Sequence, residues 1–85
     1  MTAAASERDE DSPGTLDDAQ WQGMRAGFSE AGIIMPARQA QFVHEALSYR
    51  GMSWQHGPDL WWLSRREAGI VLEALHDRRR GVPHA

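Results

Sequence analysis

Apolar residues recur at helical spacing in three separate stretches of this chain. The first stretch contains Trp21, Met24, Phe28 and Ala31, the second Phe42, Val43, Ala46 and Leu47, and the third Ala68, Val71, Leu72 and Leu75. Steps of three and four residues place such side chains on one face of an α-helix. The pattern therefore predicts an all-α fold, a small three-helix domain.

Local signals suggest where the first two helices begin and end. Thr15 is a suitable N-cap because its side-chain oxygen can accept a hydrogen bond from a free backbone N–H, and Gly32 is a suitable C-cap. Pro36 fits the first position of a second helix, which Gly51 would end. Residues 33–35 then form a tight connection, and a short connection predicts antiparallel neighbours.

Two glycines lie inside the first predicted helix, at positions 23 and 27. Each costs about 1 kcal/mol relative to alanine in a helix interior. Either these glycines permit close packing against another helix, or this helix depends on tertiary contacts to form.

The third helix has the clearest start signal. Ser64 and Glu67 match a capping box, in which each side chain accepts a hydrogen bond from the other residue's backbone N–H. Gly81 and Pro83 would end the helix. We therefore predict a folded domain over residues 15–80 and a flexible C-terminus over residues 81–85.

The segment between the second and third helices, residues 52–63, has no helical pattern. Its centre, residues 56–59, reads His-Gly-Pro-Asp and is typical of a turn. Aromatic residues flank this turn on both sides, so the segment is expected to form either a short hairpin or a structured loop.

Charge divides the chain into two unequal parts. Residues 1–19 hold six acidic residues against one arginine, a net charge of −5, whereas residues 20–85 hold eight arginines against six acidic residues, a net charge of +2. Residues 1–14 also lack large apolar side chains beyond Met1, so we predict a disordered acidic tail there. The tail is interpreted either as a solubilising segment or as an acidic arm that mimics phosphate or screens the basic body.

The order of these signals resembles a short helical module common in phage and actinobacterial proteins. The matching positions lie within residues 20–75 and are Gln20, Met24, Gly32, Ile33, Arg38, Phe42, Val43, Leu47, Gly51, Ser53, Leu60, Leu63, Ser64, Glu67, Ala68, Leu72 and Leu75. That module often stands at the C-terminus of phage recombination or other DNA-metabolism proteins, so the resemblance implies a DNA-transaction context. The four tryptophans are additions to the pattern, and no large catalytic or annealing domain accompanies it.

The sequence contains no recognisable catalytic or metal-binding motif. There is no cysteine, and no serine stands in the context of a nucleophile motif. The four histidines, at positions 44, 56, 76 and 84, are scattered, and no two have the i, i+4 spacing that places two metal ligands on one helix face. We therefore predict a protein that is not an enzyme and that has no cofactor and no metal.

Tryptophan is abundant for a chain of 85 residues, and three of the four tryptophans fall between positions 54 and 62. Trp21, Trp54 and one of the adjacent pair are expected to fill the core of a small domain. Neighbouring residues in an extended segment point to opposite sides, so Trp61 and Trp62 are not both expected to be buried. An exposed tryptophan is a typical interface anchor, and Trp54, Trp61 and Trp62 are therefore candidate partner-binding residues.

Arginines cluster at both ends of the last predicted helix. Arg78, Arg79 and Arg80 suit a helix C-terminus, where cations complement the dipole. Arg65 and Arg66 oppose the dipole in the first turn, so a phosphate or an acidic partner is expected to compensate them. All five arginines join the candidate partner-binding residues.

Two classes of function follow from these features. The first is a non-catalytic protein-interaction adaptor of phage or actinobacterial mobile-element type that acts in a DNA-transaction context. The alternative is a nucleic-acid-binding accessory protein of recombination, replication or transcription, although a net charge of +2 on the body is low for a DNA-binding domain. A protein partner is expected, and nucleic-acid binding and homo-oligomerisation stay open. The lack of cysteine, of a signal peptide and of an apolar run of about 18 residues predicts a cytoplasmic protein without membrane contact.

Overall fold

A computed structural model describes residues 10–79 of the chain, so residues 1–9 and 80–85 lie outside the description. Three helices, α2 (Asp18–Ala31), α3 (Pro36–Tyr49) and α4 (Arg65–Arg79), are joined by loops that include one turn of 3-10 helix, η1 (Leu60–Trp62). No strand occurs within residues 10–79, so the predicted all-α fold is confirmed. None of the described helices is long and apolar enough to cross a bilayer.

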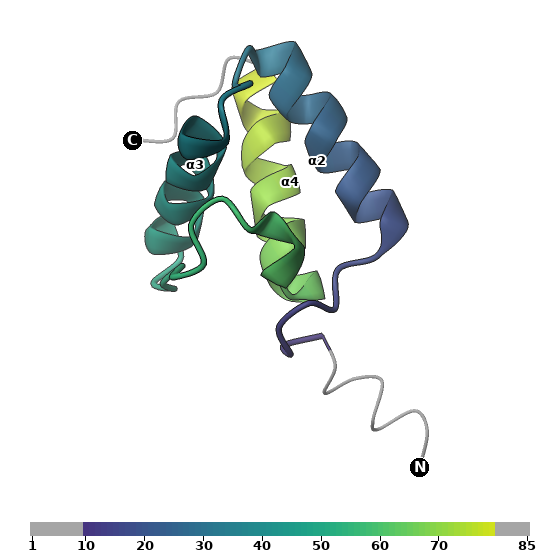
Figure 1. Ribbon diagram of the computed structural model, residues 1–85, viewed down its shortest axis with the longest axis vertical. Coiled ribbons are helices and arrows are strands. Elements are labelled where there is room, and N and C mark those ends of the chain that lie inside the picture. Colours follow the sequence, from purple (N-terminus) through teal and green to yellow (C-terminus); the bar gives the residue numbers. More distant parts are fainter. Residues whose placement is uncertain (1–9, 80–85) are drawn as a thin grey trace.

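Helix α4 forms the centre of the domain, with α2 on one side and α3 on the other (Figure 1). The two outer helices run in opposite directions, as the short connection between them predicts, but each packs mainly on α4. An edge-to-face contact between Phe28 and Phe42, with ring centroids 5.7 Å apart, joins α2 to α3. The short connection therefore sets the direction of α3, and α4 supplies most of its packing surface.

The core consists of the apolar stripes of the three helices together with residues from the loop before α4. Its buried members are Met24, Phe28, Val43, Leu47, Trp54, Leu60, Leu63, Ala68, Val71 and Leu75. Trp21, which is expected to fill the core, is only half-buried at its edge, and so is Leu72 of the third apolar stripe. Gly23 and Gly27 face the side chains of Leu72 and Leu75. The two glycines therefore lie where α2 and α4 approach closely. This agrees with the first predicted explanation, that the glycines permit close packing against another helix.

Helix α2 begins later than predicted. Its N-cap is Asp17, which forms a capping box with Gln20: the Gln20 N–H donates to Asp17 Oδ1 at 2.7 Å, and the Asp17 N–H donates to Gln20 Oε1 at 3.1 Å. The prediction that Thr15 is the N-cap was therefore wrong. Thr15 Oγ1 instead accepts a hydrogen bond from the Arg65 N–H at 3.0 Å and donates one to the Ser12 carbonyl at 2.7 Å. Gly32 ends the helix with a left-handed φ of 76°, as predicted.

The second and third helices begin where local signals predicted. Pro36 is the first residue of α3, and the left-handed Gly51, with φ of 77°, follows its C-terminal end. At α4, the Ser64 N–H donates to Glu67 Oε1 at 2.9 Å, and the Glu67 N–H donates to Ser64 Oγ at 3.1 Å. The predicted capping box is therefore present. The helix end predicted at Gly81 and Pro83 and the flexible C-terminus predicted for residues 81–85 lie outside the described residues.

The segment between α3 and α4 is a structured loop and not a hairpin. It runs from Arg50 to Asp59 without a strand and then enters η1. Trp54 holds this loop together, because its indole N–H donates to the Gly57 carbonyl at 2.8 Å while its ring is buried. The loop is therefore built around an aromatic core residue.

Residues 10–14 pack on the folded domain, although we predicted that the whole segment 1–14 would be a disordered tail. The Gly14 N–H donates to the Trp62 carbonyl at 2.9 Å, and the Arg66 N–H donates to the Glu10 carbonyl at 3.0 Å. These contacts satisfy backbone groups of η1 and of the first turn of α4. The boundary of the domain therefore lies at least five residues before the predicted one, and residues 1–9 of the predicted tail are outside the described part.

Candidate protein-interaction surface

The turn η1 is fixed to the domain at both ends. Leu60 and Leu63 are buried in the core, and the Leu63 N–H donates to the Leu60 carbonyl at 3.0 Å. The Trp62 N–H donates to the Asp59 carbonyl at 3.1 Å, and the Trp62 carbonyl accepts the bond from Gly14. The backbone that carries both adjacent tryptophans is therefore rigidly placed.

Both adjacent tryptophans are exposed, Trp61 to 55% and Trp62 to 43%. One of the two was expected to be buried, because neighbours in an extended segment face opposite sides. A 3-10 turn has about three residues per turn, so residues three apart point in the same direction. Leu60 and Leu63 take the inward direction, which leaves the two residues between them facing outward.

His56 lies beside these tryptophans and orders one of them. Its ring stacks on that of Trp62, with centroids 5.5 Å apart and an angle of 21° between the planes. The same imidazole meets the buried Trp54 ring edge-to-face at 5.0 Å. We call Trp61, Trp62 and His56 the aromatic surface. From the sequence, His56 is expected only as a turn residue, because nothing local indicates a stacking contact with a residue six positions later.

Trp54 does not belong to this surface. Only 8% of it is exposed, and its N–H is satisfied within the loop. The burial of its ring supports the interpretation of Trp54 as a core residue, and its ring is not exposed to a partner in this structure. Among the three candidate tryptophans, the two in η1 remain available to a partner.

Arg65 and Arg66 are exposed in the first turn of α4, and the chain itself compensates Arg66. The Arg66 Nε donates to Asp11 Oδ1 at 2.5 Å, and a terminal guanidinium nitrogen lies 3.8 Å from Glu10 Oε1. The hydrogen bond to Asp11 and its negative charge raise the pKa of Arg66 above its ordinary value. The compensating acidic groups therefore come from the N-terminal segment, which agrees with the interpretation of this segment as an acidic arm.

The second arginine cluster lies far from the first. Arg78 is exposed near the end of α4, whereas the side chain of Arg79 and all of Arg80 lie outside the described residues. Thirteen residues separate Arg65 from Arg78, which is roughly 20 Å along a helix. The two clusters consequently do not form one continuous track of cations.

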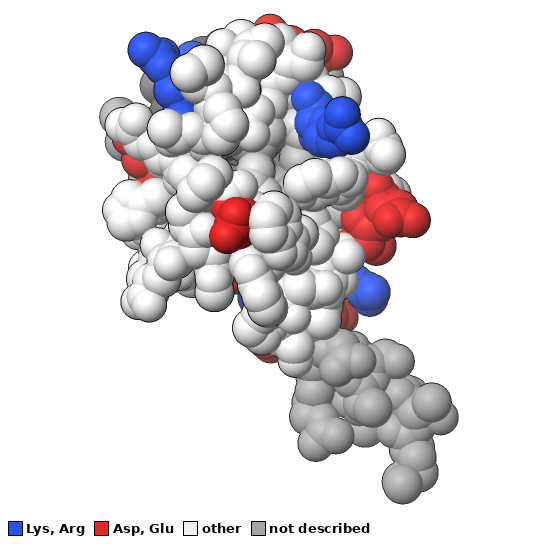
Figure 2. All heavy atoms as spheres, viewed as in Figure 1, with Lys and Arg blue, Asp and Glu red and all other residues white. Residues whose placement is uncertain are grey.

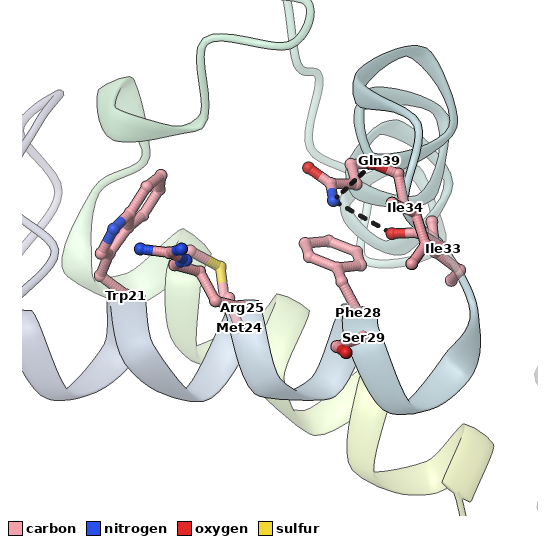
Figure 3. A pocket seen from close by; sticks show the side chains of 8 residues that line it. All are labelled: Trp21, Met24, Arg25, Phe28, Ser29, Ile33, Ile34 and Gln39. Atoms are coloured by element: carbon pink, nitrogen blue, oxygen red, sulfur yellow. Dashed lines mark hydrogen bonds between the residues drawn. The ribbon is translucent and has the colours of Figure 1, made fainter.

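A groove of about 290 Å³ runs along α2 and the α2–α3 connection (Figure 3). Most of its lining is apolar, and its residues are Trp21, Met24, Arg25, Phe28, Ser29, Ile33, Ile34 and Gln39. From the sequence, the apolar members of this set are expected in the core and in the helix connection. No local signal predicts the groove, because its walls come from α2, the α2–α3 connection and α3.

The face of the domain that carries the loop and η1 is largely uncharged, and the few charged groups on it and around it are separated from one another (Figure 2). Within residues 10–79, no three His, Asp or Glu side chains gather closely enough to hold a metal ion. The exposed apolar area of η1 is supplied by Trp61 and Trp62.

No family model matches this chain, and neither a curated protein nor a solved structure matches it. The resemblance to a phage and actinobacterial helical module therefore stays a prediction.

Proposed function

We propose that this protein is a small non-catalytic interaction adaptor that docks on a protein partner through Trp61 and Trp62. The observation that carries the proposal is the exposure of two adjacent tryptophans, 55% and 43%, on a turn whose backbone is hydrogen-bonded and anchored in the core. Tryptophan is among the residues most enriched at the energetic centres of protein interfaces. A surface that exposes two of them side by side is well suited to such a centre.

The rigidity of η1 favours binding as much as its composition does. Ordering a flexible side chain at an interface costs about 0.5–1.5 kcal/mol, and a residue that is already held avoids much of this cost. The stacking of Trp62 on His56 holds one ring before any partner arrives. Complete burial of a large apolar side chain contributes about 1.5–3 kcal/mol, and the exposed part of Trp61 and Trp62, about half of each, can supply a corresponding share of the binding energy.

The partner is expected to offer an apolar depression with acceptors for the two indole N–H groups. Buried indole nitrogens usually find a hydrogen-bond partner, so such acceptors would add specificity. The resemblance of the sequence to a recombination-associated module suggests a component of a DNA-transaction complex as this partner.

Direct binding of nucleic acid receives less support from the geometry. The carboxylates of Glu10 and Asp11 pair with Arg66, which leaves Arg65 as the other exposed cation of this turn, and Arg78 is roughly 20 Å away along α4. The face that bears η1 is largely uncharged (Figure 2). Phosphate recognition would need several cations in one track.

The experiment is affinity capture from the source organism with the full chain as bait, followed by titration of the purified partner. The double variant Trp61→Ala, Trp62→Ala is compared with Tyr49→Ala, which removes an exposed aromatic residue on α3. We expect the double variant to lose about 100-fold or more in affinity and the control variant to bind within about twofold of the parent chain. Equal affinity of all three chains, with unchanged circular dichroism, would contradict the proposal.

A further inference from the structure

The groove along α2 has an apolar floor, an aromatic residue at one end and an aliphatic residue at the other. Met24 and Phe28 are core residues whose surfaces close the floor, Trp21 stands at one end, and the exposed Ile34 stands at the other (Figure 3). Its volume of about 290 Å³ is at the low end for a small-molecule pocket, which is typically about 300–1,000 Å³. The space therefore suits one or two side chains better than a cofactor.

Gln39 places an oriented hydrogen-bond acceptor at this groove. Its Nε2 donates to the Ile33 carbonyl at 3.0 Å and to the Ile34 carbonyl at 3.4 Å. Because these bonds hold the amide group, its oxygen points away from the α2–α3 connection and toward the Trp21 side of the groove (Figure 3). An amide oxygen in that position can accept an N–H from the backbone of a bound segment.

Arg25 is the charged residue of the lining and lies between Trp21 and Phe28 along the groove (Figure 3). Its side chain is exposed, and it forms no ion pair with any other residue between 10 and 79. A ligand that brings a carboxylate to this position would therefore meet an available guanidinium group.

We propose that the groove binds a short extended peptide segment of a partner protein, with an apolar side chain on the Met24–Phe28 floor and an acidic residue at Arg25. The three groups match three features of such a segment: the floor takes the side chain, Gln39 takes a backbone N–H, and Arg25 takes the carboxylate. A single cation does not neutralise enough phosphates to bind a nucleic-acid backbone. It would also not distinguish one lipid headgroup from another. This site goes beyond the proposed function because it uses neither Trp61 nor Trp62.

The experiment is an NMR titration of the ¹⁵N-labelled full chain with a panel of capped octapeptides. Each peptide carries one central Leu, Ile or Phe followed by Glu at the first, second or third position, and a matched peptide carries Gln in place of Glu. We expect at least one acidic peptide to bind with a dissociation constant of about 0.01–1 mM and to shift the signals of the Trp21 indole and the Gln39 amide. The matched Gln peptide should bind about three- to fivefold more weakly.

Two pairs of variants test the assignment of the site. Arg25→Gln should weaken binding of the acidic peptide about three- to fivefold, whereas Arg38→Gln, at an exposed position outside the groove, should not change it. Ile34→Ser should also weaken binding, whereas Met35→Ser should not, because both residues are exposed (66% and 62%) and only Ile34 lines the groove.

Several results would overturn the proposal. The first is equal affinity for the Glu and Gln peptides together with no effect of Arg25→Gln. The second is that the peptide shifts the signals of Trp61 and Trp62 in place of those of Trp21 and Gln39. The third is that no peptide binds with a dissociation constant below about 5 mM. Groove signals that move on dilution of the chain alone would assign the groove to a second copy of this protein and would also overturn it. The Trp61→Ala, Trp62→Ala chain should still bind the peptide, so failure of the aromatic surface and failure of the groove are separate outcomes.

Discussion

The backbone of Gly27 in α2 lies directly against the side chain of Leu75 in α4. A Cβ atom at position 27 would stand 2.9 Å from Cδ1 and 3.3 Å from Cβ of Leu75. One turn earlier, a Cβ atom at Gly23 would stand 3.0 Å from Cδ2 of Leu72, the mobile tip of a half-buried side chain. The two glycines thus differ in how readily their neighbour can move away.

Replacing each glycine with alanine should have opposite effects on stability. Gly27→Ala is expected to lower the free energy of unfolding by about 0.5–2 kcal/mol, because crowding at the base of Leu75 outweighs the gain in helix propensity. Gly23→Ala should be neutral or raise it by up to about 1 kcal/mol, since only the tip of Leu72 must move. Chemical denaturation of the two variants measures the difference, and a Gly27→Ala chain more stable than the Gly23→Ala chain would contradict this packing.

Ser64→Ala should lower the free energy of unfolding by about 1 kcal/mol, because the hydroxyl that accepts the Glu67 N–H is lost at the start of the central helix. Ser53→Ala is the matched control, since Ser53 is exposed in the loop before η1. Equal stability of the two variants would indicate that the capping box contributes nothing measurable.

Two deletions separate the described N-terminal segment from the residues before it. Removing residues 1–9 retains every described contact and should leave the melting temperature within about 1 °C. Removing residues 1–14 eliminates the acceptor for the Arg66 N–H and the donor to the Trp62 carbonyl. For a domain of this size, a loss of about 1 kcal/mol corresponds to about 4–8 °C in melting temperature. Differential scanning calorimetry distinguishes the two chains, and equal melting temperatures would show that residues 10–14 do not stabilise the domain.

Removing both cations from the first turn of α4 should leave stability nearly unchanged. In the double variant Arg65→Ala, Arg66→Ala, the exposed ion pairs of Arg66 are lost, but the unfavourable placement of positive charge at a helix N-terminus is also relieved. We expect a change within about 0.5 kcal/mol in urea denaturation. A loss above about 1.5 kcal/mol would show that these side chains are structural and would remove them from the candidate partner-binding residues.

Binding to nucleic acid can be tested by its dependence on salt. Contacts with phosphates release counterions, so affinity falls steeply as salt rises, whereas an aromatic protein interface responds weakly. We expect neither duplex nor single-stranded DNA to bind with a dissociation constant below about 1 µM at physiological salt. Fluorescence anisotropy measures it, and nanomolar binding with a steep salt dependence would favour the nucleic-acid-binding alternative.

Features that depend on a few neighbouring residues were predictable from the sequence. Pro36 at the start of α3, the left-handed Gly32 after α2 and the capping box of Ser64 and Glu67 all occur where the pattern places them. Each of these signals acts within about one helical turn, so the chain far away hardly affects it. The apolar stripes likewise predicted three helices and most of their buried positions.

Only the tertiary structure decided the features that join distant residues. Thr15 serves the start of α4 at Arg65 in place of its own helix, and Asp11 pairs with Arg66, which is 55 positions later. Trp54 is buried, whereas Trp61 and Trp62, in the same loop region, are exposed. The pair is exposed because a 3-10 turn directs Leu60 and Leu63 inward. The groove is lined by residues of α2, of the α2–α3 connection and of α3, which only the packing of these elements brings together. Contacts of this kind depend on how the helices assemble, and no local pattern of residues encodes that arrangement.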